Sequence, residues 1–336
     1  MMTRIGLRIL SAIPTLLGVV VVTFLLTRVL PGDPAVFFAS NPAMSAADIA
    51  AVRESLGLDR PLYEQFLIYL GNLAQGDLGR SIATGQPVAA EFARRLPASA
   101  ELTFLAFFLA VVVAVPLGLV AALRPGSLID HAARLIATLG VSMPTFVTGL
   151  LLIHVFYFRA GVMPEPIGRL DPFLFEPARV TGFLTIDALF AGDRQVFVAA
   201  LHQMMLPAVT MALFALAPLA RMTRASMIAT LGSEFIRSAR AAGLSRGKII
   251  VVYALRNAML PVVTTMGMVF SYMLGANVLV ERVFSWPGIG AFAIDSIVNL
   301  DYAPLQGFVL IMAAIFIAVN LIVDIVTVLI DPRVEN

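Results

Sequence analysis

Six long runs of apolar residues, each free of charged side chains, divide the chain. A helix needs about 20 apolar residues to cross the hydrocarbon layer of a membrane, and each run has about that length. The runs are Ile9–Thr27, Leu102–Leu123, Leu135–Phe158, Gln195–Ala220, Asn257–Val280 and Tyr302–Val323. They predict an all-α, polytopic membrane protein with six transmembrane helices. The first run has 19 uncharged residues, against about 7–15 for a signal-peptide core, so we expect the first helix to be retained.

The composition agrees with a membrane protein. Of the 336 residues, 60% are hydrophobic and 13% are charged, whereas a soluble domain carries roughly 25% charged residues. The surplus apolar surface therefore has to face lipid. The formal net charge of +2 gives no reason to expect a nucleic-acid partner. The absence of cysteine excludes disulfides and thiolate chemistry, and His131, His154 and His202 lie too far apart in sequence to suggest a metal site.

The distribution of charge between the runs predicts the orientation. The segment Arg221–Arg256 carries seven basic residues and one acidic residue, Glu234. The two longest connections, Pro31–Pro97 and Arg159–Arg194, contain more acidic than basic residues. Basic residues in short loops stay on the cytoplasmic side. We therefore expect both termini in the cytoplasm and the two long connections outside.

The outward connections contain local folding signals. Ser45–Leu56 is predicted to be a short helix that Ser45 caps, and Pro61–Leu73 is predicted to be a second, amphipathic one. Gly76–Ser81 is expected to form a turn, and a further short helix is expected around Thr185–Ala191. These segments could form a folded cap or a docking surface for an extracytoplasmic partner, and the two interpretations are compatible.

The basic loop between the fourth and fifth runs carries the clearest functional signal. Ser233 can cap a short helix, Gly243 suits the left-handed position at its end, and Ser245 can cap the next helix. Small side chains in this helix allow another protein to approach closely, Phe235 and Ile236 offer an apolar anchor, and two arginines can pair with carboxylates of a partner. The small residues are Ala239, Ala241 and Ala242, and the arginines are Arg237 and Arg240. Such a helix can transmit force from a soluble partner.

A few ionisable residues lie in or near the apolar runs. Asp324 lies inside the sixth run, and His154 and His202 lie toward the outer ends of theirs. We interpret these three as packing or cavity-lining residues, since a single carboxylate makes no proton relay. Glu101 and Glu281 are expected at outer boundaries that water can reach.

The loop also carries a family resemblance. Ala239-Arg240-Ala241-Ala242-Gly243 resembles the coupling-loop signature of binding-protein-dependent ABC importer permeases, in the variant of dipeptide and oligopeptide permeases. The glutamate that begins the general form of the signature is absent here. Five further motifs, in the same order, are similar to the first permease of that group: Leu30–Pro34, Gly76–Gly79, Pro144–Phe146, Val283–Gly290 and Asp331–Arg333.

The resemblance implies a type I ABC importer permease fold and a role. It implies a first helix with a periplasmic segment (residues 1–98), a five-helix core (99–331) with a coupling loop (223–257), and a cytoplasmic tail (332–336). The chain would be the permease subunit of an ATP-driven importer that takes di- or oligopeptides from a periplasmic binding protein across the bacterial inner membrane. Its partners in the lipid bilayer and around it would be a second homologous permease, two cytoplasmic ATPases and the binding protein.

The resemblance also implies where these partners dock. The ATPase would contact the coupling loop at Ser233, Glu234, Phe235, Ile236, Arg237, Ala239, Arg240, Ala241, Ala242 and Gly243, and the periplasmic partner would contact Asp33, Asp77 and Trp286. No stretch of the chain matches a phosphate-binding loop, so the chain is expected to be no enzyme and to bind no cofactor, with ATP and Mg²⁺ held by the ATPases.

Two questions stay open from the sequence. An ion-coupled secondary transporter of small solutes is the alternative function, although such proteins commonly carry several ionisable groups at mid-membrane depth. The cargo of the importer could be a dipeptide, an oligopeptide, a nickel chelate or another small solute.

Overall fold

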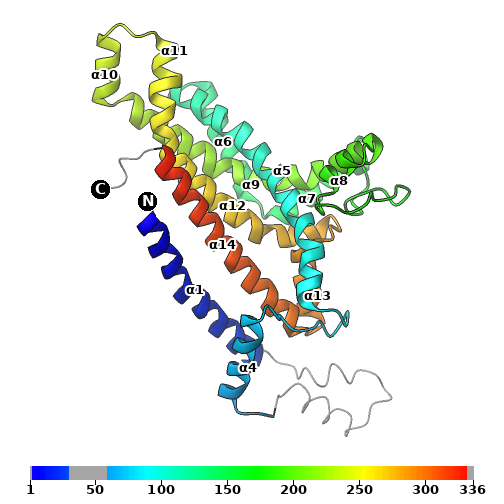
Figure 1. Cartoon of the computed structure of the whole chain (residues 1–336). Helices are drawn as coiled ribbons and strands as arrows, with labels where there is room; N and C mark the ends of the chain where they lie inside the picture. Colours follow the sequence, from blue (N-terminus) through cyan, green and yellow to red (C-terminus); the bar gives the residue numbers. More distant parts are fainter. Residues whose placement is uncertain (1, 30–58, 331–336) are drawn as a thin grey trace. The chain divides into compact units, whose positions relative to one another are not determined.

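The computed structural model describes residues 2–29 and 59–330, and in this part of the chain the regular secondary structure is helical (Figure 1). Five of the six apolar runs lie wholly within helices and the third is helical on both sides of a break, which confirms the all-α prediction. Five runs lie in single long helices: α1 (Met2–Val29), α5 (Val88–Leu123), α9 (Arg194–Leu231), α12 (Arg256–Val283) and α14 (Tyr302–Ile330). Four stretches, within α5, α9, α14 and Arg246–Gly275, are long and apolar enough to cross a membrane.

The third run is not one helix. α6 (Leu128–Ser142) ends before Met143, and α7 (Thr145–Leu152) begins after Pro144 and continues as the π-helix η1 (Ile153–Arg159). Met143 is extended, with φ −115° and ψ 143°, because the ring of the following proline disfavours helical backbone at the preceding residue. The predicted span Leu135–Phe158 is therefore broken after its first eight residues.

α9 is longer than predicted. It has 38 residues, whereas the predicted span Gln195–Ala220 covers only its apolar part. Its first turn is capped by Asp193, whose Oδ1 accepts a hydrogen bond from the Val196 N–H at 3.0 Å. Pro207 and Pro218 lie inside the helix without ending it.

The shorter helices lie in the connections. α4 (Leu62–Ala74) and α8 (Leu184–Phe190) confirm the helices predicted at Pro61–Leu73 and Thr185–Ala191. The basic loop folds as α10 (Glu234–Ala241), α11 (Arg246–Lys248) and the π-helix η2 (Ile249–Leu255), and α13 (Ile289–Val298) follows α12. The predicted helix Ser45–Leu56 and the motif Leu30–Pro34 lie outside the described residues.

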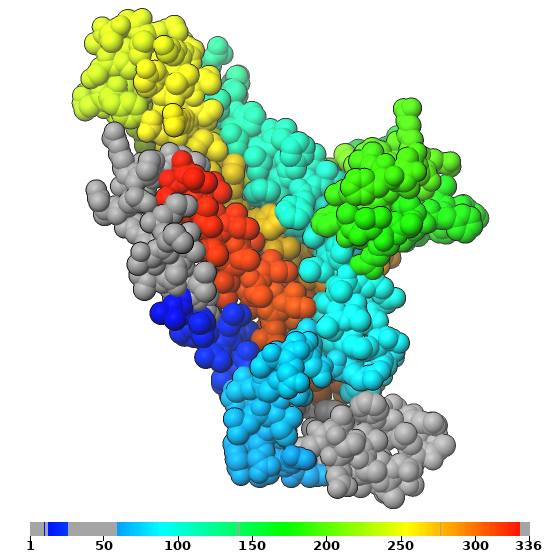
Figure 2. Space-filling model, viewed as in Figure 1, coloured from blue at the N-terminus to red at the C-terminus, as the bar shows by residue number. Residues whose placement is uncertain are grey.

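The chain divides into two compact units. Among the described residues, the first contains 98–286 and the part of α14 from Phe316 onward, and the second contains 2–29, 59–97 and 287–315. In the first unit α9 packs against α6, α7 and α12, and its core is rich in small side chains such as Ala110, Ala208 and Ala215. Figures 1 and 2 show α10 and α11 at one end of this unit and α8 with its neighbouring loop at the other.

The second unit has its own apolar cluster. Val88 and Phe92 of α5 pack with Ile289 and Phe292 of α13. The rings of Phe92 and Phe292 meet edge to face, with their centroids 5.7 Å apart. The predicted turn at Gly76–Ser81 also belongs to this unit, and it is confirmed by positive φ angles at Gly76 (77°) and Gly79 (82°).

Candidate functional site

The residues Ser233–Gly243, which we call the coupling segment, form α10 and the turn after it. One side chain fixes this helix to its own chain. Ile236 is fully buried, in a cluster with Met227 of α9 and with Ile249 and Ala254 of η2. We predicted Ile236 to be an anchor for a partner, and that prediction is wrong, because this side of the helix faces the body of the subunit.

Several other side chains of α10 are exposed. The side chain of Phe235 is 43% exposed, and Arg237, Arg240 and Ala241 are also exposed. Arg237 donates a hydrogen bond from Nη1 to Oε1 of Glu234 on the same helix at 2.7 Å. The exposed part of α10 therefore offers an aromatic ring, two guanidinium groups and small side chains to another molecule.

The C-terminal end of α10 follows the prediction, whereas the predicted side-chain cap at its N-terminal end is not formed. Gly243 has φ +76°, which confirms the left-handed turn. Ser233 occupies the N-cap position, but its hydroxyl donates to the Thr230 carbonyl at 2.5 Å instead of accepting from the helix. Ser245 precedes α11, likewise without a capping hydrogen bond from its side chain.

A buried ion pair joins α6 to α9. Asp130, in the first turn of α6, is 1% exposed and pairs with Arg224 of α9. Its Oδ2 also accepts from the Gly126 N–H at 2.9 Å. The hydrogen bonds from Arg224, then that from Gly126, hold the pKa of Asp130 well below its usual range. The carboxylate is therefore ionised at neutral pH and locks the loop before α6 to α9.

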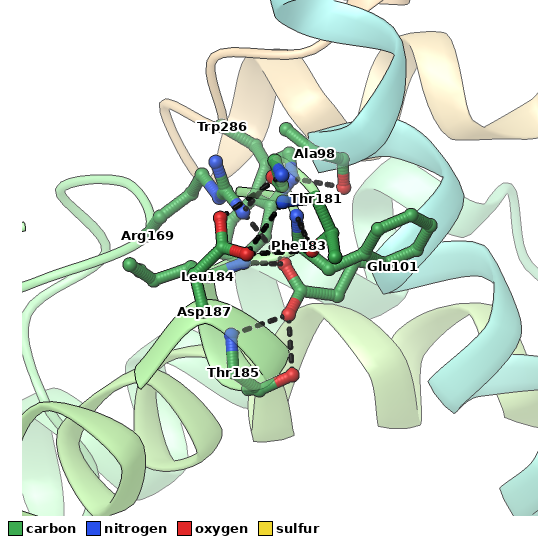
Figure 3. Close-up of polar contacts among 10 residues, drawn as sticks. Ala98, Glu101, Arg169, Thr181, Phe183, Leu184, Thr185, Asp187 and Trp286 are labelled. Atoms are coloured by element: carbon green, nitrogen blue, oxygen red, sulfur yellow. Dashed lines mark hydrogen bonds and ion pairs between the residues drawn. The ribbon is translucent and has the colours of Figure 1, made fainter. Parts of the chain in front are cut away.

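A second polar cluster surrounds Glu101 of α5 (Figure 3). The carboxylate is 6% exposed and accepts a hydrogen bond from Nη2 of Arg169 at 2.7 Å. It also accepts from the backbone N–H of Leu184 at 3.1 Å, and from the N–H and the hydroxyl of Thr185 at 2.8 and 2.5 Å. We call these four residues the Glu101 cluster. It ties the start of α8 and the loop before it to α5.

Asp187 stabilises the same loop. Its Oδ1 accepts from the N–H and the hydroxyl of Thr181, both at 2.7 Å, and its Oδ2 accepts from the Gly182 N–H at 2.9 Å. Burial alone would raise the pKa of Asp187, but these hydrogen bonds outweigh it and hold the pKa below its usual value. Together with the Glu101 cluster, Asp187 makes the loop before α8 a well-ordered structure.

Trp286, Glu101 and Glu281 are buried, although they were predicted to be accessible to a partner or to water. Trp286 is 1% exposed and donates from Nε1 to the Ala98 carbonyl at 2.9 Å, so it offers no docking surface to a partner (Figure 3). Glu281 is 0% exposed and accepts from the Ser99 hydroxyl at 2.5 Å. Water was expected to reach Glu101 and Glu281, and both expectations are wrong because hydrogen bonds within the chain enclose these carboxylates.

The remaining predicted residues lie on separate elements. Asp33 lies outside the described residues, and Asp77 is exposed in its turn, where Oδ1 accepts from the Gly79 N–H at 2.8 Å. His154 on η1 stacks against Phe158, and His202 is exposed on α9. Asp324 is half-buried on α14. Among the described residues, no group of three His, Asp or Glu residues could hold a metal ion.

The sequence interpretation missed the partners of Glu101 and of Asp130. Arg169 lies 68 residues after Glu101, and Arg224 lies 94 residues after Asp130, so no local pattern links them. One signal was present: Ser127 and Asp130 have the spacing of a helix start, and the Ser127 hydroxyl accepts from the Asp130 N–H at 3.3 Å.

Comparison with known proteins gives two family-model matches, which together span nearly the whole chain. Residues 114–336 match the model described as binding-protein-dependent transport system inner membrane component, and residues 1–103 match the model for its N-terminal part. 

Relatives match over full length. The probable D,D-dipeptide transport system permease protein of Escherichia coli K12 is 42% identical over 317 residues, which cover 94% of this chain and 93% of the relative. The di/tripeptide transport system permease protein of Pseudomonas aeruginosa UCBPP-PA14 is 41% identical over 336 residues, with coverage of 100% and 99%. The dipeptide transport system permease protein of Escherichia coli K12 is 39% identical over 335 residues, with coverage of 99% and 97%.

Proposed function

The chain belongs to the family of binding-protein-dependent transport system inner membrane components, and from this premise we propose that it is the permease subunit of an ATP-driven peptide importer. The cargo is a di- or oligopeptide that a periplasmic binding protein delivers for passage across the bacterial inner membrane. Three relatives that match over full length carry peptide transport in their names, which supports a peptide as cargo over the ion-coupled alternative.

The working complex contains four further subunits in this proposal. A second, homologous permease completes the pathway, and two ATPases bind and hydrolyse ATP with Mg²⁺ on the cytoplasmic side. In this proposal the chain itself binds neither ATP nor Mg²⁺ and has no catalytic residue. The basic segment Arg221–Arg256 supports an orientation with α10, α11 and both termini in the cytoplasm.

The two-sided packing of α10 is the observation that carries the coupling role. Ile236 holds the helix to its own subunit, while Phe235 and Arg240 stay exposed on the surface. A groove on an ATPase can therefore bind the exposed side chains of α10. When the ATPase moves, the contacts of Ile236 transmit that movement to η2 and α9. ATP binding then shifts the permease between inward and outward states to the extent that it favours one of them.

Ala241→Glu tests this role. Ala241 is exposed at the end of α10, so a glutamate there leaves the fold intact but places bulk and charge where the ATPase must approach. In the reconstituted complex we expect peptide uptake, and the ATP hydrolysis that the loaded binding protein stimulates, to fall at least about tenfold.

Ala132→Glu is the matched control, since Ala132 is an exposed alanine on α6, outside the coupling segment and outside the outward connections. It should leave both activities near those of the wild type. Normal coupled transport by the Ala241→Glu complex would exclude the coupling role of this segment.

A further inference from the structure

The helix α4 carries more hydrophobic surface than its own chain covers. Among its 13 residues, Glu64 is the one charged side chain and Gln65 is the one buried residue. Four bulky hydrophobic side chains are between 44% and 65% exposed: Leu62, Tyr63, Leu67 and Ile68. A span needs about 20 residues, so α4 is too short to cross the membrane, and a short apolar helix that is not buried in a core is typical of the membrane interface.

The hydrophobic and polar residues of α4 lie on different sides of the helix. One face, which we call the Leu67 face, holds residues that recur at intervals of four, three and four: Tyr63, Leu67, Leu70 and Ala74. The polar side chains lie on the other side, within about 100° of arc around Ile68: Glu64, Gln65 and Asn72. The helix is therefore amphipathic, and packing within the chain leaves its Leu67 face largely uncovered.

Two ring contacts fix the level of α4 along α1 (Figure 1). Phe24 of α1 is 2% exposed and packs edge to face on Phe66, with centroids 5.2 Å apart, and it stacks on Tyr69 at 5.8 Å. Phe24 lies three residues before Thr27, where the first apolar run ends, so it is about 4.5 Å inside that end. Leu67 lies between Phe66 and Tyr69 in the chain. The middle of α4 is therefore at the boundary of the hydrocarbon layer.

The exposed surface of α1 leads up to the same place. Bulky apolar residues that recur every three or four positions along α1 are 40–62% exposed: Leu10, Ile13, Leu17, Val21 and Leu25. The chain belongs to a family of inner membrane components, so an exposed apolar stripe of this length is a membrane-facing surface. The stripe ends at Leu25, next to the Phe24 that holds α4. The Leu67 face continues it.

We propose that α4 is an interfacial helix whose Leu67 face lies in the lipid bilayer, where the headgroups meet the acyl chains. The inference goes beyond the proposed function, because it assigns part of the connection Pro31–Pro97 to the membrane and not to an extracytoplasmic partner. Aliphatic side chains at this level leave water when lipid covers them. A soluble partner could cover them only by entering the acyl region.

The polar groups at the start of α4 suit this position. The ring of Tyr63 belongs to the Leu67 face, while its hydroxyl donates to Oε1 of Glu64 at 3.2 Å, as expected of an aromatic side chain at a membrane interface. Gln65 is 9% exposed, and its Nε2 donates to the Arg60 carbonyl at 2.8 Å. The side-chain amide is thus bonded within the chain, which lowers the cost of placing it beside lipid.

Spin labels test the position of α4, because the chain has no cysteine of its own to react with them. Leu67→Cys places a label on the Leu67 face, and Asn72→Cys, the matched control, places one on the polar side of the same helix. Both wild-type side chains are exposed. In the assembled complex in proteoliposomes, the collision rates of each label are measured with oxygen, which concentrates in lipid, and with a water-soluble nickel chelate.

We expect the ratio of oxygen to nickel collision rates to be at least about threefold higher at position 67 than at position 72. Frequent nickel collisions at both positions would overturn the proposal, because water would then cover the Leu67 face. A label at 67 that neither reagent reaches would also overturn it, since protein would cover the face. Equal, oxygen-rich collisions at both positions would place the whole helix in the hydrocarbon layer and contradict an interfacial helix.

Fluorescence provides a second measurement. The single tryptophan of the chain, Trp286, is 1% exposed, so Leu67→Trp adds a fluorophore over the background that the wild type gives. Phospholipids with bromine near the carbonyl end of the acyl chains should quench the added fluorescence at least about twofold more than those with bromine near the methyl end. The reverse order, or no quenching, would contradict the proposal. Both tests measure position and not transport, so their failure would leave the proposed function standing.

Discussion

The carboxylate of Asp130 accepts two hydrogen bonds from the guanidinium of Arg224, at 2.6 Å from Nε and 2.7 Å from Nη2. A two-point pair of this kind fixes both distance and angle between α6 and α9. Asp130→Asn would leave Arg224 without its carboxylate partner. We expect the melting temperature of the purified protein to fall by roughly 3–6 °C at pH 7.

The loss of stability in Asp130→Asn should depend on pH in a definite direction. The pKa of Asp130 is lowered in the folded protein, so its contribution to stability is complete above the ordinary aspartate pKa of about 3.9 and is lost as the pH falls below it. The difference between wild type and Asp130→Asn should therefore be constant from pH 5 to 8 and shrink below about pH 4. A difference that instead shrank between pH 8 and 6 would assign the effect to another group.

Replacement of Glu101 should release the loop before α8. Glu101→Ala leaves the guanidinium of Arg169 buried without its carboxylate, at a cost of about 3–5 kcal/mol in stability. Limited proteolysis should then cut within residues 160–183, where the wild type resists. Thr185→Val removes only one of the hydrogen bonds to Glu101 and should have a much smaller effect. Resistance of Glu101→Ala to the protease would show that other contacts hold the loop.

Replacement of Ile236 should lower the stability of α10, whereas replacement of its neighbour Phe235 should weaken binding of the ATPases. Ile236→Ala creates a cavity in the cluster with Met227 and Ile249 and should destabilise the packing of α10 by about 2–4 kcal/mol. Phe235→Ala removes an exposed ring and should leave the melting temperature unchanged while weakening binding of the ATPases. Thermal unfolding and co-purification with the ATPases separate the two effects. Loss of stability in Phe235→Ala would show that its ring packs within the subunit.

The turn after α10 should tolerate asparagine better than valine. Gly243 has φ +76°, where a β-branched side chain is strained and asparagine is accepted. Gly243→Val should abolish the ATP hydrolysis that substrate stimulates while the protein still inserts in the membrane, and Gly243→Asn should retain a substantial part of it. Equal activities would show that the backbone conformation here does not matter for coupling.

Close packing of α12 on α14 should depend on Gly267. A Cβ atom built there would collide with Cγ2 of Val323, so Gly267→Ala should cost about 1–3 kcal/mol. Gly275→Ala, on the same helix but in open space, is the matched control. Combining Gly267→Ala with Val323→Ala should recover part of the lost melting temperature. Additive losses in the double variant would contradict the contact.

Local signals predicted the elements well. The position of the apolar runs, the amphipathic pattern of Pro61–Leu73 and the glycine at Gly243 each depend on nearby residues only. The structure has helices at all six runs and at Pro61–Leu73, and a left-handed turn at Gly243. The break at Pro144 was not predicted, because a search for uncharged residues does not test whether the backbone can stay helical. Pro207 and Pro218 show why proline alone does not decide this, since α9 continues through both.

The burial of individual side chains, and the face that each helix turns inward, could not be predicted from such local signals. An eight-residue helix such as α10 carries too few turns to show which face is inward, so Phe235 and Ile236 looked alike in the sequence. Glu101 and Glu281 looked accessible because their partners lie far away in the chain, in the loop before α8 and at Ser99. Tertiary contacts, which no pattern along the chain records, decide both cases.

The 38 residues of α9 span about 57 Å at the usual rise per residue, nearly twice the thickness of the hydrocarbon layer of about 30 Å. One helix thus begins at Arg194, just after α8 and the loop that Asp187 stabilises, and ends at Leu231, with only Gly232 between it and the coupling segment. A rod of fixed length cannot stretch. A push on its inner end can therefore reach the far end as tilt or rotation, and Pro207 and Pro218, which each remove one intrahelical hydrogen bond, are the two points where the helix can bend instead.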